Sequence, residues 1–434
     1  MRVTRRNFGS LLGASAALSL APLANLVLGG RARAESSRSL GPLEPRYPEN
    51  MSALPPEHQN IAYLSLPAAF DYKLVSYVDQ PMRDGNLVPG ATDGMAAFGL
   101  ARGRTALVRN HELTTSSTPL LVPDATYDPL VHGGTTTLIV DRSGNLIEQY
   151  GSLTGTDRNC AGGRTPWRSW LSCEEPLIFR SGVRHGYVFE VPATGTSDAQ
   201  PLVNLGRFNH EAVAIDPATG IAYLTEDRAD GLFYRFVPSE YGELRAPGKL
   251  QALRLLDWPG GLHTVTGFLG YLNQPLAVDW VDIAEFDPPT DTVRAEGQTK
   301  GAARFSRGEG CGYGHGSIYF VCTDGGDLRA GQVFQYDPEC ETLTLIVEST
   351  DRALLDAPDN LTSHPDGALY LCEDGSGSDN IVRVDPDGSL AILAQNAWSD
   401  SEFAGVCFDP SGRMMFVNMQ NDGLTLAIRG PFCR

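Results

Sequence analysis

Basic residues are scarce in this 434-residue chain, which has 34 Lys and Arg against 52 Asp and Glu and a formal net charge of −18 at pH 7. Five of the arginines fall within the first 34 residues, which contain no acid, so the rest of the chain carries 29 basic against 52 acidic side chains. Such a surface repels phosphate backbones and anionic lipid, which argues against nucleic acid or a membrane surface as a partner. Bound cations explain the excess of acids economically; the alternative is a solvated acidic surface that keeps the protein soluble.

Several enzyme motifs are also absent. The sequence has no G-x-S-x-G nucleophile elbow, no G-x-x-x-x-G-K-[ST] phosphate loop and no H-E-x-x-H, so serine hydrolase, P-loop and zincin mechanisms lose their usual support. The eight cysteines include no C-x-x-C pair. Cys173, Cys322 and Cys372 lie in apolar strand-like runs, where a small buried side chain is the expected role. Cys160 differs, because it lies in the turn-like segment Asn159-Cys160-Ala161-Gly162-Gly163.

The amino terminus has the pattern of a targeting segment. Thr4-Arg5-Arg6-Asn7-Phe8 precedes an uncharged run from Gly9 to Gly30, and an Ala-x-Ala site ends at Ala34. This predicts a twin-arginine export signal over residues 1–34, with the twin-arginine translocase as partner during export and a periplasmic or secreted mature protein. The breaks in the apolar run, and the lack of any later run of 18 apolar residues, argue against a stable membrane anchor.

Short alternating or apolar runs that end in Asp-Pro or Gly turns recur along the chain, whereas amphipathic helical patterns are scarce. The sequence therefore predicts an all-β fold. The predicted strands are 212–216, 221–225, 232–237, 317–323, 331–336, 368–372, 380–384 and 414–419.

Polar residues recur along these strands at one spacing. A polar residue enters a strand, and about 15 residues later another stands where the next strand ends: Cys160 leads to Glu174-Glu175, Glu211 to Glu226-Asp227, Glu309 to Asp324, Asp359 to Glu373-Asp374 and Glu402 to Asn418. With Glu112 in front, the leading positions lie 48, 51, 98, 50 and 43 residues apart, close to the length of a four-stranded propeller blade. We therefore expect one β-propeller over residues 35–434, with six blades and an insertion or extra blade within residues 240–300.

Equivalent residues of successive blades converge on the propeller axis, so these polar residues are predicted to share one small volume. Carboxylates packed together either take up protons or bind metal, and no Lys adjoins these acids, so we predict a metal site in the central channel. A thiolate at Cys160 beside carboxylates suits iron or another transition metal, and the oxygen donors of Asp359-Asn360 suit calcium. The alternative is that the acids only satisfy amides at strand ends and turns.

Two matching tripeptides and three arginines lie beside the leading positions. Asn110-His111-Glu112 and Asn209-His210-Glu211 predict that the tripeptide is the functional unit, although each His could be a structural one. Arg158, Arg228 and Arg307 each lie one to three residues from a predicted metal ligand. A guanidinium there can grip an oxyanion such as phosphate, or merely neutralise its neighbouring acid.

A resemblance to a known family is carried by the segments Asn159–Gly163, Thr165–Trp167, Trp170–Glu175, Phe208–Glu211, Tyr223–Arg228, Phe305–Gly310, Cys322–Asp327, Pro358–Leu361 and Cys372–Gly375. Together they resemble the PhoX family of exported alkaline phosphatases. The resemblance runs in order from Arg109 to Pro431 and is most specific from Asn159 to Glu175; Arg168, after Pro166-Trp167, replaces the family's usual Gly. It implies a six-bladed propeller that holds two ferric ions, bridged by a thiolate and an oxo group, together with calcium ions. The resemblance makes Cys160 the bridging ligand, draws the iron ligands from Glu174, Glu175, Glu211 and Glu309, and draws the calcium ligands from Asp359, Asn360, Glu373 and Asp374.

The function that the resemblance implies is hydrolysis of small phosphate monoesters at alkaline pH. Phosphate would dock on the metals with help from Arg158, Arg228 and Arg307, and a metal-activated oxygen would attack in line, so that no protein nucleophile is needed. Two alternatives stay open: a calcium-dependent propeller hydrolase of another ester or a lactone, and a secreted binding propeller without catalysis. We expect the protein to be a monomer.

Overall fold

The computed structural model describes residues 40–432 apart from residue 181. The predicted export signal, residues 1–34, lies outside these described residues. Among them, no helix is long and apolar enough to cross a membrane. The seven cysteines of the described part are all free thiols.

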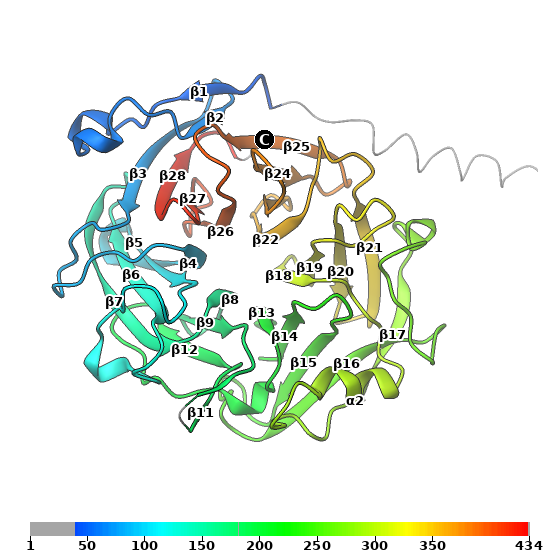
Figure 1. Cartoon of the computed structure of the whole chain (residues 1–434). Helices are drawn as coiled ribbons and strands as arrows, with labels where there is room; N and C mark the ends of the chain where they lie inside the picture. The colour runs from blue at the N-terminus through cyan, green and yellow to red at the C-terminus, as the bar shows by residue number, and fades with distance from the viewer. Residues whose placement is uncertain (1–39, 181, 433–434) are drawn as a thin grey trace, which may run out of the picture.

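Six inner strands form a closed ring around an axis, in which each strand contacts the next and the last contacts the first (Figure 1). They are β4 (Thr92–Leu100), β8 (Asn159–Arg164), β13 (His210–Ile215), β18 (Gly308–Gly314), β22 (Pro358–Ser363) and β26 (Phe403–Phe408). This arrangement is a β-propeller and confirms the predicted all-β class. The ring of inner strands fits the six blades expected from the sequence.

Antiparallel strands lead outward from each inner strand. The second strands are β5 (Arg104–His111), β9 (Ser169–Glu174), β14 (Ala222–Glu226), β19 (Ser317–Cys322), β23 (Leu369–Glu373) and β27 (Met414–Met419). The third strands are β6 (Gly133–Val140), β12 (Val188–Pro192), β15 (Phe233–Pro238), β20 (Gln332–Asp337), β24 (Asn380–Val384) and β28 (Leu424–Arg429). All eight strands predicted from the sequence are among these, with ends displaced by two residues at most.

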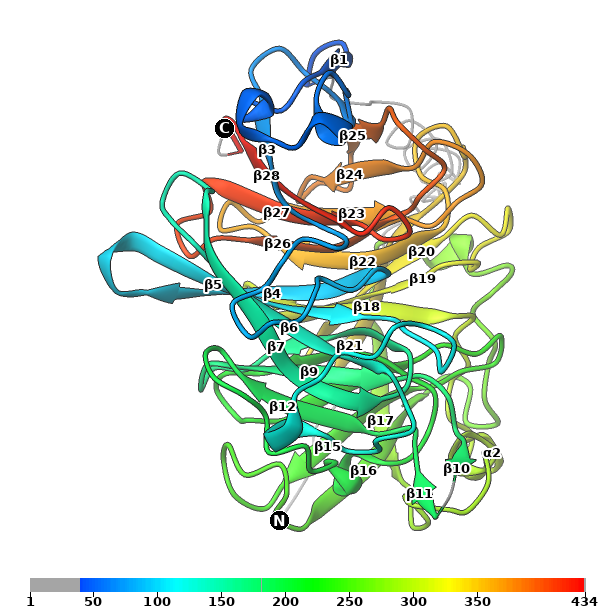
Figure 2. The same ribbon diagram turned by 60° about the vertical axis from the view of Figure 1, so that its left-hand side comes forward.

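The outer strands vary more than the inner ones. Five of the six blades have a fourth strand. In four of them it comes from the following chain segment: β7 (Leu146–Thr156), β16 (Gly248–Leu255), β21 (Thr342–Glu348) and β25 (Leu390–Asn396). In the last blade it is β3 (Asp71–Tyr77), from the start of the described chain. Strand β3 pairs with β28, so segments from the two ends of the described chain lie side by side (Figure 2). Strands β1 (Glu44–Arg46) and β2 (Leu64–Leu66) extend the sheet beyond β25.

The long step between Glu211 and Glu309 contains few additional elements. Strand β17 (Leu276–Asp282) pairs with both β16 and β21 and so joins two neighbouring sheets at their outer edges. It is followed by the one α-helix of the described residues, α2 (Val293–Thr299). These elements are fewer than a four-stranded blade requires, which favours an insertion over an extra blade. A separate short hairpin, β10 (Phe179–Arg180) with β11 (Val183–Arg184), precedes β12.

Hairpins between inner and second strands follow from their turn sequences. In Asp216-Pro217-Ala218-Thr219-Gly220, the Asp216 carboxylate accepts a hydrogen bond from the Ala218 backbone N–H at 2.9 Å, and Gly220 has φ of +75°. Proline presets φ at the second position of such a turn, and glycine enters the left-handed region at little cost. The turn Asp409-Pro410-Ser411-Gly412 repeats this arrangement between β26 and β27, with φ of +69° at Gly412.

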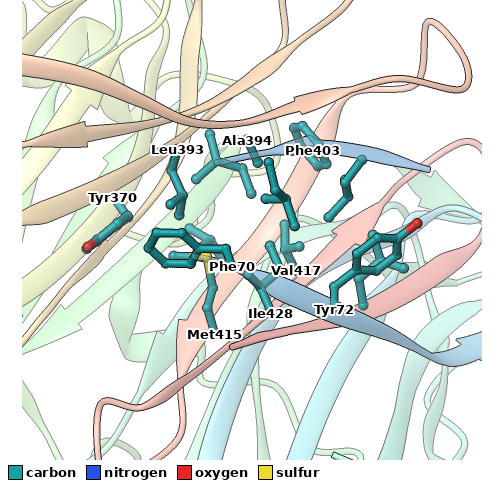
Figure 3. Packing of buried hydrophobic residues seen from close by; sticks show 14 of the residues in the cluster. Phe70, Tyr72, Tyr370, Leu393, Ala394, Phe403, Met415, Val417 and Ile428 are labelled. Carbon is teal, nitrogen blue, oxygen red and sulfur yellow. The ribbon is translucent and has the colours of Figure 1, made fainter. Parts of the chain in front are cut away.

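Apolar side chains between neighbouring sheets form the core. In the cluster of Figure 3, Phe70 and Tyr72 meet Met415, Val417 and Ile428 from the last sheet, and this layer packs against the sheet of β22–β25 through residues that include Tyr370, Leu393 and Ala394. All are at most 3% exposed. Full burial of one such side chain is worth about 1.5–3 kcal/mol, so this contact across two sheets stabilises the closure of the ring.

The inner strands approach each other too closely for ordinary side chains at some positions. A Cβ on Gly163 of β8 would lie 1.6 Å from the carbonyl oxygen of Val213 in β13. Glycine at this position is therefore a condition for the ring to close.

We predict that Gly163→Ala lowers the free energy of unfolding by more than about 3 kcal/mol, because the clash is with backbone and β8 and β13 must separate. Gly260→Ala is the matched control, since its Cβ would meet no atom within 4 Å. Chemical denaturation of both variants tests this. Equal stability of Gly163→Ala and the parent would contradict the observed approach of the two strands.

Candidate metal centre

A β-bulge occurs near the start of every inner strand. The register with the second strand shifts after Thr92, Asn159, His210, Gly308, Pro358 and Ala404. A bulge inserts one extra residue into a strand and changes the direction of a side chain. The residue directly after each of these six positions therefore occupies an equivalent place in its blade. These six residues are Asp93, Cys160, Glu211, Glu309, Asp359 and Gly405.

In four of the inner strands the residue directly after the donor position is Gly or Ala, and the packing of neighbouring strands explains why. A Cβ on Gly94 would lie 2.6 Å from the Cα of Ala161, and a Cβ on Gly310 would lie 2.5 Å from the carbonyl oxygen of Asp359. Neighbouring bulges therefore pack against each other at the axis. The potential metal ligands are brought together by backbone packing.

Three groups of donor atoms lie along this ring of bulges, and within each group the atoms are no more than 4.8 Å apart. The groups share Glu211 and Asp359, so they form one continuous series, which we call the acid arc. In order, the groups are Cys160, Glu175 and Glu211; Glu211, Glu309 and Asp359; and Asp359, Asp374 and Glu402. The arc thus combines one thiol with six carboxyl groups.

The first group is more buried than the last. Cys160, Glu175 and Glu211 are buried, whereas Asp359, Asp374 and Glu402 are partly exposed. A side chain from outside the arc fixes the bulge of β8: the amide of Asn110 donates hydrogen bonds to the carbonyl oxygens of Cys160 and Ala161, each at 2.8 Å. The thiol of Cys160 lies 3.3 Å from the carbonyl oxygen of His210 on the neighbouring strand.

Two predicted ligands, Glu174 and Glu373, do not belong to the arc. Glu174 accepts hydrogen bonds from the backbone N–H groups of Asp157, Gly186 and Tyr187 and from His185. Glu373 likewise accepts from the backbone N–H groups of Asp356 and Asn380. Both end a second strand and tie it to its neighbours, while the following residue, Glu175 or Asp374, joins the arc.

Asn360 also lies outside the donor groups. Its amide nitrogen donates to the Asp359 carboxylate at 2.9 Å, and its oxygen accepts a hydrogen bond from the Gly405 N–H. It therefore orients a member of the arc and joins β22 to β26.

The expected leading position of Glu112 is wrong. Glu112 follows the second strand β5, whose last residue His111 pairs with Thr92, so it corresponds to Glu175, Asp227 and Asp374. The residue on the inner strand is Asp93, which the spacing did not reveal. Asp93 is 5% exposed, and its carboxylate accepts a hydrogen bond from Gln420 at 3.0 Å.

The two histidine tripeptides occupy different structural positions. His111 bonds to the Gly90 carbonyl and Thr136 at the end of a second strand. His210 begins an inner strand, bonds to the Gly206 carbonyl and lies against Phe208, with the two rings tilted by 34° and 3.7 Å between their centroids. Both histidines are fully buried and lie outside the donor groups. The tripeptide is therefore not a repeated functional unit.

Two of the three predicted arginines contact the arc. Arg158 forms an ion pair with Glu175 at 2.5 Å, and Arg307 forms one with Glu309 at 2.8 Å. Arg228 instead lies 3.6 Å from Asp291, which is not a member of the arc. Of the three predicted arginines, Arg158 and Arg307 are therefore the two that lie where a guanidinium could bind an oxyanion at the acid arc.

Burial and mutual repulsion raise the pKa values of the acids. Burial, followed by the charge of Glu112, raises the pKa of Glu175 to about 7, and burial with Asp374 raises that of Asp359 to about 8. Burial and repulsion from Glu309 raise the pKa of Glu211 well above its ordinary value. Burial also raises the pKa of the Cys160 thiol, with Glu211 adding to the effect. Cations fit this donor set, because they would remove the repulsion that the arc creates.

A cavity of about 390 Å³ lies on the other side of the bulges. Its walls begin one residue after the donor of each strand, at Gly94, Ala161, Ala212, Gly310 and Asn360. No member of the arc lines it, so it is separate from the metal centre.

Comparisons with known proteins identify the family. The family described as "Alkaline phosphatase PhoX" matches residues 50–423. Among solved structures, Pseudomonas fluorescens PhoX in complex with vanadate, a transition state analogue, has a TM-score of 0.67 at 16% identity over 85% of this chain and 96% of that one. A gluconolactonase from Xanthomonas campestris has a TM-score of 0.47 at 12% identity over 91% of this chain and 99% of that one.

No curated protein matches the sequence. The family match nevertheless spans all six bulges and the whole acid arc. The chain therefore belongs to the PhoX family of alkaline phosphatases.

Proposed function

We propose that the acid arc holds the metal ions with which this member of a phosphatase family hydrolyses phosphate monoesters. The observation that carries the proposal is the continuous series of seven donors, with a thiol at one end, on the axis of a PhoX-family propeller. The vanadate bound to the Pseudomonas fluorescens protein identifies a phosphate-like oxyanion as the ligand class to test.

The donor chemistry differs along the arc. Cys160, Glu175 and Glu211 offer a soft thiolate with two carboxylates, a set that suits ferric iron. Asp359, Asp374 and Glu402 offer only oxygen and are partly exposed, which suits calcium. Glu309 lies in the middle group, with Glu211 and Asp359. In this proposal Glu174, Asn360 and Glu373 support the ligands, and Arg228 is not part of the site.

Metal ions held by the acid arc would supply Lewis acidity, which would neutralise phosphoryl charge and lower the pKa of water. The protein's own contribution is to hold seven donors in place and to offer cationic hydrogen-bond donors to the substrate. Arg158 and Arg307 contact opposite ends of the Glu175 to Glu309 section of the arc and carry side chains that are 44% and 37% exposed. Their guanidinium groups would bind the equatorial oxygens of a phosphate ester.

We also propose that residues 1–34 direct export through the twin-arginine translocase to the periplasm or beyond. The route exports folded proteins, so the metals would be loaded before the chain leaves the cytoplasm. The twin arginines Arg5 and Arg6 carry this proposal. In this proposal the exported protein is a monomer.

Hydrolysis of p-nitrophenyl phosphate at alkaline pH tests the function. We expect turnover by protein purified with its native metals, loss of turnover with a calcium chelator, and recovery when calcium is restored. Bis-p-nitrophenyl phosphate and gluconolactone are the control substrates for diesterase and lactonase activity. Turnover of a control substrate alone, or none with fully metal-loaded protein, would overturn the proposal.

Cys160→Ser tests the assignment of the thiolate. We expect loss of iron and a fall in kcat of about 100-fold or more, because a hydroxyl is a poor substitute for a thiolate ligand. Cys311→Ser is the matched control: Cys311 is a buried cysteine on inner strand β18, two residues beyond Glu309 and outside the arc. Metal analysis and kinetics on both variants decide the matter; full iron content in Cys160→Ser would remove Cys160 from the ligand set.

The raised pKa values predict how pH acts on metal-free protein. In the folded state Glu175 and Asp359, with pKa values of about 7 and 8, stay protonated up to about those pH values, but both ionise near pH 4 to 5 in the unfolded chain. Stability is therefore lost as pH rises from about 4.5 to 8, on the order of 3 kcal/mol for Glu175 alone. We expect the Tm of chelator-treated protein to fall across this range and added calcium to reverse the fall. A Tm that rises with pH in chelator would contradict the repulsion within the arc.

A further inference from the structure

Arg158 and Arg307 occupy the same place in two different blades. Each lies two residues before the donor of its bulge, Cys160 or Glu309, and their φ angles are +47° and +49°. Ala91 and Ala357 have the same conformation, with φ of +47° and +49°, two residues before Asp93 and Asp359. The left-handed conformation is thus a repeated feature of the fold, and in two blades it carries an arginine.

The acids that pair with these arginines are equivalent as well. Glu112 and Asp227 each follow the last residue of a second strand, β5 or β14, in the blade that precedes the arginine. The Nε of Arg158 donates to Glu112 at 2.9 Å, and the Nε of Arg307 donates to Asp227 at 3.0 Å. Neither acid belongs to the arc. The other oxygen of Glu112 accepts a hydrogen bond from Gln420 at 2.9 Å, which fixes the acid in turn.

Each guanidinium is therefore held on one side and open on another. Its Nη2 contacts both the holding acid and a member of the arc: Glu112 and Glu175 for Arg158, and Asp227 and Glu309 for Arg307. Within the described residues, Nη1 of neither arginine has a hydrogen-bond partner. Without the holding acid, all three guanidinium nitrogens of such an arginine could pair with carboxylates of the acid arc.

We propose that Glu112 and Asp227 are positioning residues that hold Arg158 and Arg307 by the Nε side, which leaves Nη1 available to the phosphoryl oxygens of the substrate. This inference rests on the proposed phosphatase function. It explains why a pair of one acid and one arginine recurs at equivalent places in two pairs of blades, and why the acids lie outside the ligand groups. Holding an arginine in advance saves the side-chain entropy that phosphate binding would otherwise cost.

Alanine variants of the two acids test the proposal. For Glu112→Ala and Asp227→Ala, we expect KM for p-nitrophenyl phosphate and the inhibition constant of inorganic phosphate to rise about 10-fold each. The fall in kcat should be smaller, and the iron and calcium contents should match the parent. Glu112→Gln and Asp227→Asn keep one oxygen that can accept from Nε, so they should recover part of the affinity.

The double variant separates positioning from other roles. Once Arg158 is replaced by Ala, removal of Glu112 should raise KM no further. Glu148→Ala is the matched control, because it breaks the exposed Arg83–Glu148 pair, with a contact of 2.7 Å, on the outer strand β7; its kinetics should equal those of the parent.

Three results would overturn the proposal: unchanged KM and phosphate inhibition in both alanine variants, loss of metal from either, or a full additional effect of Glu112→Ala in the Arg158→Ala background. Loss of metal would make the acids ligands instead. If an alanine variant fails to fold, the Gln and Asn variants and the Arg158 comparison still decide. Wild-type turnover is measured first, so failure of the phosphatase function is recognised separately.

Discussion

Repulsion between carboxylates at the propeller axis is the constraint that the rest of the structure accommodates. The inner strands, together with the end of the second strand β9, bring Glu175, Glu211, Glu309 and Asp359 into donor groups whose atoms are no more than 4.8 Å apart. Burial removes most of the water that would screen these charges, and the raised pKa values of about 7 and 8 at Glu175 and Asp359 express the cost. The repulsion within such a cluster is relieved by protonation, by bound metal cations or by arginine side chains. At alkaline pH protonation is lost, so an alkaline phosphatase has to rely on metal cations and arginines.

The ring of sheets supplies the force that opposes this repulsion. Apolar layers between sheets, such as the one containing Phe70, Tyr72 and Ile428, hold the blades together, and close contacts at Gly163 and Gly94 fix how near the inner strands come. Bulges then aim the donors, and Asn110 ties down the bulge that carries Cys160. The metal centre is therefore built from backbone geometry as much as from the identity of the ligands.

Periodicity in the sequence predicted the propeller and most of the arc, because each blade repeats one bulge and one strand end. It missed Asp93, since the hairpin of β4 and β5 is longer and places its acid 19 residues later, at Glu112, instead of about 15. It could not separate Glu174 from Glu175, or Glu373 from Asp374. Adjacent residues at a strand end point to different sides, and only the three-dimensional register shows which one reaches the axis. The pairing of Arg158 with Glu112 joins different blades and leaves no local signal.

The pairing of β3 with β28 makes the proposed metal centre dependent on segments from both ends of the described residues. Strand β3 precedes every donor, β28 follows every donor, and the last sheet is complete only when both are present. A ribosome-bound chain that lacks β28 has all of its ligands but an open ring, and the carboxylates are free to move apart. The geometry that the proposed metal site needs is therefore acquired only after β28 has been made and has paired with β3.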